Sequence, residues 1–413
     1  MTDTSTISAE PTTAGLPDYP APRDARCPFD PGPGLRDLQA ETPITKVQWW
    51  DGSTPWLVTD YAEHRALLAD PRISADGLHP SHPPRAAGMR EAHQKHGRPF
   101  IRMDDPEHAR LRRTVTAPFT VKRAEAMRPA LQKLVDGLVD DLLAGPNPVD
   151  LVEAFALVVP SLVICEVMGV PYEDHDFFQE NSKMLVRRDA DPQQGADADQ
   201  RLLGYMGELL DKKLVTPGDD LMTEVAQRVR AGELTRDEAT RIGQLLLLAG
   251  HDTTANMIAL GTLALFQNPD QFAILRDSDD PKLAASAVEE LLRYLTIVHI
   301  GHPRTALEDI EIGGVVIRAG DGVLLPAEIV NRDPALFPDP DRLDVTRDAR
   351  GHVAFAFGPH QCLGQNLARV ELQIVYSTLY RRIPTLRLAT SLDNIAFKEN
   401  ALVYGVHEMP VTW

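Results

Sequence analysis

The stretch FAFGPHQCLGQNLARVEL, residues Phe355–Leu372, places one of the chain's three cysteines between two glycines. Gly358 lets the backbone turn sharply before Cys362, and Gly364 removes side-chain bulk just after it. The residues that follow have helical spacing, so we expect Cys362 at the start of a helix, where unpaired N–H groups and the helix dipole favour a thiolate. The pattern therefore predicts a cysteine that is either a nucleophile or a metal ligand.

The residues around Cys362 bear on the choice between these two roles. A structural zinc site needs four ligands, and no CxxC or HxxxH pair accompanies this cysteine. A nucleophilic thiolate needs a positioned base, and His360 is only two residues away, a separation that rarely allows that contact. As the axial ligand of a haem iron, a single cysteine is enough.

Composition narrows the class of protein. The 413 residues carry a net charge of −18, with 60 acidic and 42 basic residues, which argues against nucleic-acid binding. Three scattered cysteines do not make a disulfide framework and favour a reducing compartment. The N-terminal MTDTSTISAEPTTAG lacks the basic and apolar blocks of a signal peptide, and no apolar run is long enough to span a membrane. We therefore expect a cytoplasmic protein with no membrane segment.

The hydrophobic pattern is mainly helical, with small β-sheets. Residues 1–34 are proline-rich and are predicted to form an irregular arm, and residues 35–413 to form a single domain. A capping box at Thr235 and Glu238 begins a helix that runs to Asn268. A strand is predicted at 56–60 and a hairpin at 310–317.

The middle of the predicted long helix, LLLLAGHDTTAN at 245–256, carries polar residues where burial makes them costly. Thr253 can donate a hydrogen bond back to the Ala249 carbonyl and open a polar notch, and Gly250 lets a flat ligand approach. The alternative is an ordinary core helix in which Asp252 is satisfied and Thr253 only bends the backbone.

The sequence EELLRYL places Glu290 and Arg293 on one face of another helix, for which Asp280 and Pro281 provide the start. Such a pair is common on solvated helices. The proline-rich loop that follows offers Arg342 as a third member of a buried network.

Three of these segments together resemble the cytochrome P-450 family of haem-thiolate monooxygenases. FAFGPHQCLG is similar to its haem-binding signature FxxGxxxCxG, AGHDTT to its oxygen-activating helix motif, and ELLR to its ExxR motif. The resemblance covers roughly residues 40–413 and implies the cytochrome P-450 fold, with haem between a long central helix and the cysteine-bearing loop. HARLRR, GQNLAR and the ending MPVTW resemble the actinobacterial members that oxidise secondary metabolites and sterol-like molecules. Ala356 departs from the pattern, since a second glycine is usual there.

The resemblance implies roles for individual residues. Cys362 would be the axial iron ligand of heme b (iron protoporphyrin IX), and Asp252 and Thr253 would deliver protons to dioxygen during its reduction. Two further sets are implied: haem propionate contacts at His108, Arg112, Arg304 and His360, and a structural triad of Glu290, Arg293 and Arg342. Of the other cysteines, Cys165 reads as a core thiol and Cys27 has no evident role.

Partners follow from what the chain lacks. There is no dinucleotide fingerprint and no cysteine cluster for iron and sulfur, so we expect electrons from a ferredoxin and its NAD(P)H-linked reductase, serving a monomeric enzyme. The segment 102–128 has seven basic and four acidic residues and is the predicted docking face.

Two activities stay open at this point. One is oxygen insertion, as hydroxylation or epoxidation, into a bulky apolar substrate such as a macrolide, polyketide, terpenoid or sterol. The other is binding or rearrangement of a ligand without reduction of dioxygen; the intact Asp252 and Thr253 favour the first. Predicted pocket residues are the loop 75–100 and Leu248, Ala249, Ile297, Val298, Leu402 and Val403.

Overall fold

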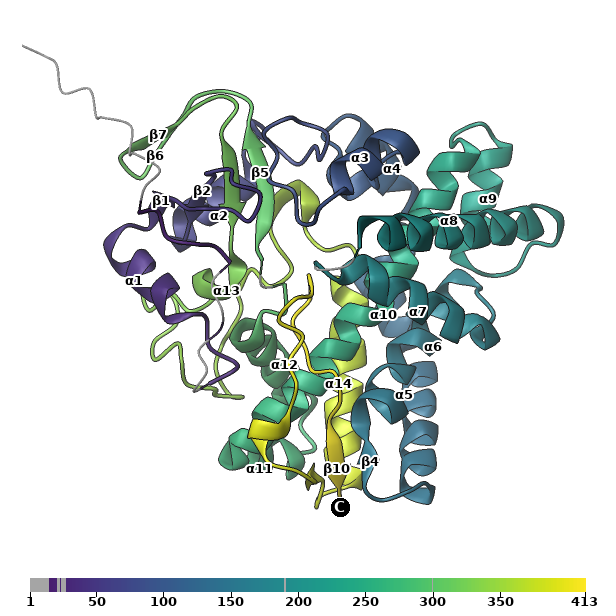
Figure 1. Ribbon diagram of the computed structural model, residues 1–413. Coiled ribbons are helices and arrows are strands. Elements are labelled where there is room, and N and C mark those ends of the chain that lie inside the picture. The colour runs from purple at the N-terminus through teal and green to yellow at the C-terminus, as the bar shows by residue number, and fades with distance from the viewer. Residues whose placement is uncertain (1–14, 21–22, 24–26, 189–190, 299) are drawn as a thin grey trace, which may run out of the picture.

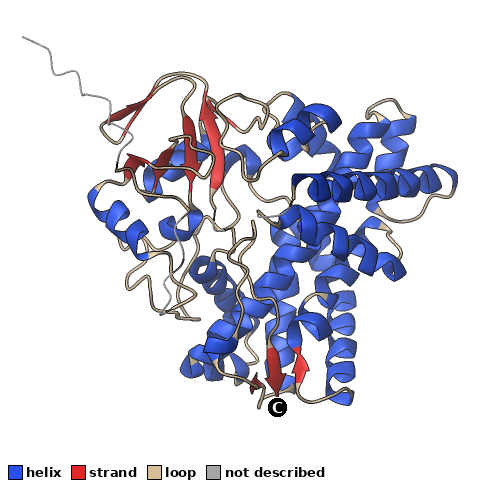
Figure 2. Ribbon diagram, viewed as in Figure 1, coloured by secondary structure: helices blue, strands red, loops and turns tan. Residues whose placement is uncertain are grey.

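The computed structural model describes residues 15–20, 23, 27–188, 191–298 and 300–413. It is mainly helical with small sheets, as predicted; most strands lie at one side of the molecule, and a second small sheet lies beside the C-terminus (Figures 1 and 2). The helices are α1 Pro33–Glu41, α2 Tyr61–Ala69, α3 Met89–His96, α4 Glu107–Val115, α5 Val121–Ala144, α6 Val158–Met168, α7 His175–Val186, α8 Pro192–Val215, α9 Leu221–Arg230, α10 Arg236–Gln267, α11 Pro269–Arg276, α12 Pro281–Leu295, α13 Ala327–Val330 and α14 Gln365–Arg382.

The strands are short and pair mostly antiparallel. They are β1 Ile44–Lys46, β2 Trp56–Val58, β3 Ile73–Ser74, β4 Val149–Asp150, β5 His302–Ala306, β6 Ile310–Ile312, β7 Val315–Ile317, β8 Gly322–Leu325, β9 Arg387–Leu388 and β10 Pro410–Thr412. Within the described ranges, one sheet has the order β1-β2-β8-β5-β3, in which β2 and β8 are parallel and β8 pairs Val323 with Arg304 of β5. The predicted hairpin is β6–β7, and it turns on Gly313 and Gly314, both at positive φ.

The long central helix is α10, whose limits agree with the sequence prediction. Both halves of its capping box are formed: Thr235 Oγ accepts from the Glu238 N–H, and Glu238 accepts from the Thr235 N–H. Its 32 residues correspond to roughly 48 Å of helix. Since α10 packs against α6, α8, α12 and α14, its middle is buried among other helices (Figure 1).

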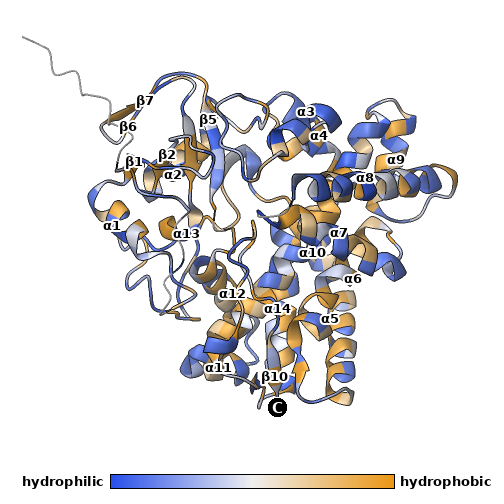
Figure 3. Ribbon diagram, in the orientation of Figure 1, coloured by the Kyte–Doolittle hydropathy of each residue, from blue (hydrophilic) through white to orange (hydrophobic). Residues whose placement is uncertain are grey.

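The core of the helical part is continuous from α5 and α6 through α10 to α12 and α14. Figure 3 shows the apolar residues of these helices gathered in the interior, while α3, α8 and α9 carry more hydrophilic residues. In the described residues no helix is both long and apolar enough to cross a bilayer. Burial of Cys165 in this core confirms its predicted place.

Part of the predicted N-terminal arm lies on the fold. Tyr19 is buried and its ring stacks on Trp49 with 5.9 Å between centroids, and Asp18 bridges to Gln48. The first helix begins at Pro33, so it takes in the last two residues of the predicted arm, 33 and 34. Residues 1–14, 21–22 and 24–26 of the arm are outside the described part of the chain.

Candidate functional site

The loop that carries Cys362 is held at both ends. The Cys362 N–H donates to the Phe355 carbonyl at 2.9 Å, and α14 begins three residues later. Gly358 has φ +74°, and a Cβ there would lie 2.6 Å from the Leu68 carbonyl oxygen. Glycine is therefore required at 358 both for backbone conformation and for contact with α2.

Ala356 is the residue that departs from the family pattern. Its φ is +57°, in the left-handed region that costs a residue with a Cβ about 1 kcal/mol. The chain thus adopts the glycine-type backbone at this position with an alanine, at a cost in strain.

Cys362 faces a cavity of about 310 Å³ that lies between the loop and α10. The candidate site and pocket residues from the sequence that line it are Arg112, Ala249, Thr253, Ile297, Val298, Arg304, His360 and Cys362, together with Arg85 and Phe100 of the predicted loop 75–100. His108 lies behind His360, with 4.0 Å between the ring centroids. Leu248 and Leu402 do not line the cavity, and Val403 lines a different one, because the segment 397–406 packs beside α10 rather than over Cys362.

One end of this cavity is strongly basic. Arg102 is 7% exposed and Arg304 5% exposed; burial lowers the pKa of Arg102 to about 10, and burial with the nearby Arg102 charge lowers that of Arg304 to about 9. Burial, then the charges of Arg102 and Arg304, also lowers the pKa of Arg85. Among the described residues, no carboxylate forms an ion pair with these three groups or with Arg112.

Two imidazoles complete this basic end. His108 Nε2 and His360 Nδ1 are buried without a hydrogen-bond partner within the described ranges, and burial is the main cause of the lowered pKa of each ring. Buried guanidiniums need an anionic partner, and the two unpaired imidazole nitrogens need a hydrogen-bond partner. Arg85 lies in the predicted pocket loop 75–100, whereas the sequence placed Arg102 only in the docking segment 102–128 and gave His302 no role.

The Cys362 thiol has a raised pKa, first because of burial. The backbone N–H groups of Gly364 and Gln365 and the charges of Arg112 and Arg369 act in the opposite direction. The start of α14 therefore favours the thiolate, as predicted, but does not outweigh burial. A metal cation at the sulfur would supply the missing stabilisation, since coordination deprotonates a thiol.

The α10 segment facing Cys362 has the predicted polar notch. Thr253 Oγ1 donates to the Ala249 carbonyl at 2.8 Å, and His251 and Asn256 bond back to Leu247 and Asp252 in the same way, each at 2.8 Å. Thr254 lines the same cavity as Thr253, so both threonine residues lie at the face of α10 that borders this cavity.

Gly250 and Asp252, which lie in the same segment of α10, have different surroundings from those expected. A Cβ at Gly250 would lie 2.6 Å from Ile164 Cδ1, so this glycine accommodates α6. Asp252 lines a second cavity of about 690 Å³, which shares no lining residue with the first.

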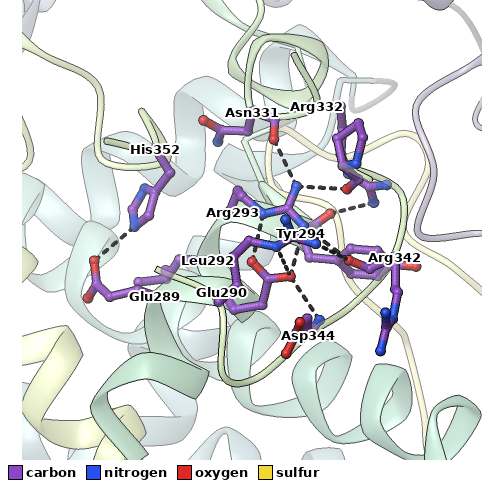
Figure 4. Close-up of polar contacts among 12 residues, drawn as sticks. Glu289, Glu290, Leu292, Arg293, Tyr294, Asn331, Arg332, Arg342, Asp344 and His352 are labelled. Atoms are coloured by element: carbon purple, nitrogen blue, oxygen red, sulfur yellow. Dashed lines mark hydrogen bonds and ion pairs between the residues drawn. The ribbon is translucent and has the colours of Figure 1, made fainter. Parts of the chain in front are cut away.

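The Glu290–Arg293 pair is fully buried, with Arg293 Nε 2.7 Å from Glu290 Oε2 and Nη2 2.9 Å from Oε1 (Figure 4). Arg293 also donates to the carbonyls of Asn331 and Pro340, at 3.0 and 2.8 Å. This network ties α12 to the loop that leads toward Cys362.

The prediction of Arg342 as third member was wrong. Arg342 contributes only its carbonyl, 3.4 Å from Arg293 Nη2, and its exposed side chain points away from the pair (Figure 4). Arg347 takes that place, with Nε 3.2 Å from Glu290 Oε1. The loop turns between the two arginines, where Asp344 N–H also donates to Glu290.

Glu371 of α14 is another site residue without a sequence signal. It is 4% exposed, lines the cavity with Cys362, and its Oε2 has no partner in the described part of the chain. Burial raises its pKa to about 8. The carboxyl group is thus held neutral near pH 7.

A raised carboxyl pKa in the folded state makes stability fall as pH rises from 4.5, the ordinary value, to about 8. At about 1.4 kcal/mol per pH unit, the loss is at most roughly 5 kcal/mol. Glu371→Gln cannot ionise, so its free energy of unfolding should fall less between pH 5.5 and 8 than that of the wild type. Urea unfolding of the haem-loaded proteins measures this difference. The exposed Glu311→Gln is the control, and equal pH slopes for Glu371→Gln and wild type would contradict the assignment.

The shape and charge of the first cavity set two requirements for its ligand. It must carry negative groups for the basic end and a metal that accepts a single cysteine sulfur. An iron porphyrin with two carboxylates meets both requirements, so the fold and site define a helical haem-thiolate protein.

The chain belongs to the cytochrome P450 family. The family model "Cytochrome P450" matches residues 211–383. Cytochrome P450 GfsF of Streptomyces halstedii is 56% identical over 418 residues, covering 100% of both chains, and its crystal structure superposes with a TM-score of 0.90 over 96% of this chain and 100% of that one. The family and the fold predicted from sequence are confirmed. The protein is a P450 monooxygenase, and its family implies a haem-iron cofactor.

Two further relatives have names that state an activity. Vitamin D3 dihydroxylase of Streptomyces griseolus is 44% identical over 418 residues, with 100% of both chains covered. The mycinamicin VIII C21 methyl hydroxylase MycCI of Micromonospora griseorubida, solved with mycinamicin VIII bound, is 38% identical with a TM-score of 0.90 over 96% of this chain and 100% of that one. The family is thus shown by full-length similarity and not by one motif.

Proposed function

We propose that this P450 monooxygenase binds heme b between Cys362 and α10 and hydroxylates or epoxidises a bulky apolar substrate. The observation that carries the proposal is the single cavity lined by Cys362, by Thr253 and by unpaired guanidiniums. The proposed substrate classes are macrolide, polyketide, terpenoid and sterol. Support comes from the mainly apolar walls away from the basic end, including Val163, Leu245, Ala249, Ile297 and Val298, and from the names of the relatives.

Different residues would bind the iron and the propionates of the cofactor. Cys362 would bind the iron, and His108, Arg112, Arg304 and His360 would bind the propionates, with Arg102 close enough to join them. Bound haem supplies the redox chemistry that activates dioxygen. The chain's own contribution is to position the substrate over the metal, exclude bulk water with apolar walls and move protons.

Proton movement is assigned to the pair on α10. Thr253 presents its hydroxyl to the cavity with Cys362, whereas Asp252 lines the second cavity. Adjacent helical residues point about 100° apart, so the pair links the two cavities across one flank of α10. Asp252 would accept protons on one side and Thr253 would hold a proton donor in place on the other.

Thr253→Ala should uncouple the enzyme. Substrate binding and electron uptake do not need the hydroxyl, so consumption of reduced nicotinamide should persist while product per nicotinamide falls several-fold and hydrogen peroxide appears. Product, peroxide and nicotinamide measured together give the coupling ratio. Because Thr254 shares the cavity, the better control is Thr253→Ser, which keeps the hydroxyl and should stay coupled. Full coupling in Thr253→Ala would contradict the role.

The direct test of the proposal is a spectral titration with a panel of macrolides, polyketides, terpenoids and sterols. A binder should displace water from the iron and then stimulate nicotinamide consumption when ferredoxin and reductase are added. Binding without any stimulated consumption would favour ligand binding or rearrangement over oxygenation.

We also propose ferredoxin and its reductase as the electron donors, with docking near the start of α5. Of the seven basic residues in 102–128, Arg102 and Arg112 face the cavity, Arg110 pairs with Glu238 and Arg128 with Glu125. The remaining three, which are exposed, are Arg113, Lys122 and Arg123. This surface is close to the cysteine loop, because Arg112 donates to the Gln361 carbonyl at 2.6 Å and Asn366 to that of Phe119 at 2.9 Å.

Charge reversal of Arg113, Lys122 and Arg123 to glutamate should slow ferredoxin-driven reduction at least tenfold at low salt and remove its salt dependence above about 0.1 M. Stopped-flow reduction measures the rate. Arg387→Glu in β9 is the exposed control. An unchanged rate in the triple variant would place docking on another face.

A further inference from the structure

The first cavity holds more positive charge than its proposed cofactor can neutralise. Four guanidinium groups line it, those of Arg85, Arg102, Arg112 and Arg304, and arginine stays protonated in proteins. Haem brings two propionate carboxylates, whereas its iron is neutralised by the porphyrin and the thiolate. No carboxylate of the described residues forms an ion pair with any of the four. Two positive charges therefore remain without a counter-charge, which is costly at a buried site.

Arg85 is the guanidinium with the fewest partners. Its Nη2 donates to the Gly301 carbonyl at 3.1 Å, and its Nε is buried without a hydrogen-bond partner within the described ranges. Burial lowers the pKa of Arg85, and the charges of Arg102 and Arg304 lower it further. The Asp104 carboxylate raises the pKa of Arg304 but is not among the charges that act on Arg85. Arg85 thus borders the cavity with donors that no part of the described chain satisfies.

The backbone next to Arg85 is fixed by two indole rings. The Nε1 groups of Trp49 and Trp50 each donate to the Pro84 carbonyl at 2.8 Å. Trp49 is 1% exposed, so this anchor belongs to the core of the sheet region. Arg85 is therefore held in place before any ligand arrives, which reduces the ordering cost of binding.

His302, the first residue of β5, lies on the same wall of the cavity. Its Nε2 is buried and has no partner in the part of the chain that the structure describes. Burial, then the charges of Arg304 and Arg85, lowers the pKa of His302, so its imidazole is neutral. A neutral imidazole can still donate one hydrogen bond to an anion. The apolar residues Ile297 and Val298 line the cavity a few positions earlier in the chain.

We propose that Arg85, with His302 beside it, binds a carboxylate of the substrate, so that the enzyme acts on a bulky apolar acid and not on a neutral molecule. A carboxylate fits because its two oxygens match the N–H groups of a guanidinium, and Ile297 and Val298 suit the apolar body. Arg102, Arg112 and Arg304 stay with the haem propionates. This inference rests on the proposed function and narrows its substrate classes to their acidic members.

The test compares bulky acids with their own methyl esters on the haem-loaded enzyme. The probes are abietic acid, ursolic acid and lithocholic acid, and isothermal titration calorimetry gives each Kd without turnover. At least one acid should bind about tenfold more tightly than its ester, the effect of hydrogen bonds to a charged group. Arg85→Gln should weaken binding of that acid about tenfold and change binding of the ester by less than about twofold.

Two further variants control for charge. Arg85→Lys keeps the positive charge without the paired N–H groups and should retain part of the preference for the acid. Arg318→Gln removes an exposed guanidinium beyond β7 and should bind both compounds as the wild type does. If no acid bound more tightly than its ester, or if Arg85→Gln kept the wild-type preference, the inference would be overturned.

Haem retention separates this role from a contact to the cofactor. Arg85→Gln should lose haem to apomyoglobin at the wild-type rate. Faster haem loss, together with equal weakening for acid and ester, would make Arg85 a propionate ligand and overturn the inference. Failure of the proposed function is a separate result: acids that bind through Arg85 but stimulate no nicotinamide consumption with ferredoxin and reductase would support the carboxylate site and contradict oxygenation.

Discussion

Replacing Cys362 with serine should abolish the long-wavelength Soret band of the reduced carbon monoxide complex. That band requires a thiolate ligand, and Cys362 is the cysteine that faces the cavity among the described residues. The surroundings of the Cys362 sulfur favour the neutral thiol. Its replacement removes the iron ligand, and no other described cysteine lines the cavity to take its place.

The other cysteines provide the controls for this experiment. Cys165 is a core thiol whose pKa is raised to about 12 by burial, and Cys27 lies near Asp30 in the N-terminal part of the chain. Cys165→Ala and Cys27→Ala should keep the band in whatever protein folds. A band that survives in the Cys362→Ser variant would overturn the assignment of the ligand.

Arg293→Ala should destabilise the protein by about 3–5 kcal/mol, the range for breaking a buried ion pair from one side. The change removes both hydrogen bonds to Glu290 and those to two loop carbonyls, and leaves a fully buried carboxylate. We expect loss of haem content on purification and a lower denaturation midpoint. Both can be measured on the same samples by absorption and urea titration.

Two nearby arginines make this prediction discriminating. Arg347→Ala removes one contact to Glu290 while Arg293 stays, so its cost should be smaller, about 1–3 kcal/mol. Arg342→Ala removes only an exposed side chain and should change stability by no more than about 0.5 kcal/mol. If Arg342→Ala were as costly as Arg347→Ala, the observed pairing of Glu290 would be wrong.

Local patterns in the sequence predicted the elements well. Thr235 and Glu238 cap α10, Asp280 accepts from the Lys282 N–H at the start of α12, and the hairpin turns on its two glycines, because each signal lies within a few residues. The position of Cys362 at the start of a helix was predicted for the same reason, since the signal lies in the neighbouring residues. The sequence also correctly predicted the back-bond from Thr253 to Ala249, one turn away.

The missed features depend on where a loop points its side chains. Arg342 and Arg347 lie five residues apart in a turning loop, and no periodicity says which faces Glu290. Arg102 and Glu371 look like ordinary charged residues until the fold buries them beside Cys362. Leu402 and Val403 were wrongly assigned to the first cavity, since the packing of Gly405 on Asn256 is a long-range contact with no local signature; Val403 lines the second cavity.

The basic end of the first cavity ties the abundance of this enzyme to the supply of its cofactor. Before haem arrives, the folded chain must hold Arg102 and Arg304 under its surface without an anionic partner. Such a state is less stable than the loaded one by the free energy of binding, so a larger share of chains is open to proteases at any moment. A cell short of iron or porphyrin would then clear the empty chain faster than the loaded one, and the steady-state level of the protein would follow haem synthesis without any regulatory element in its gene.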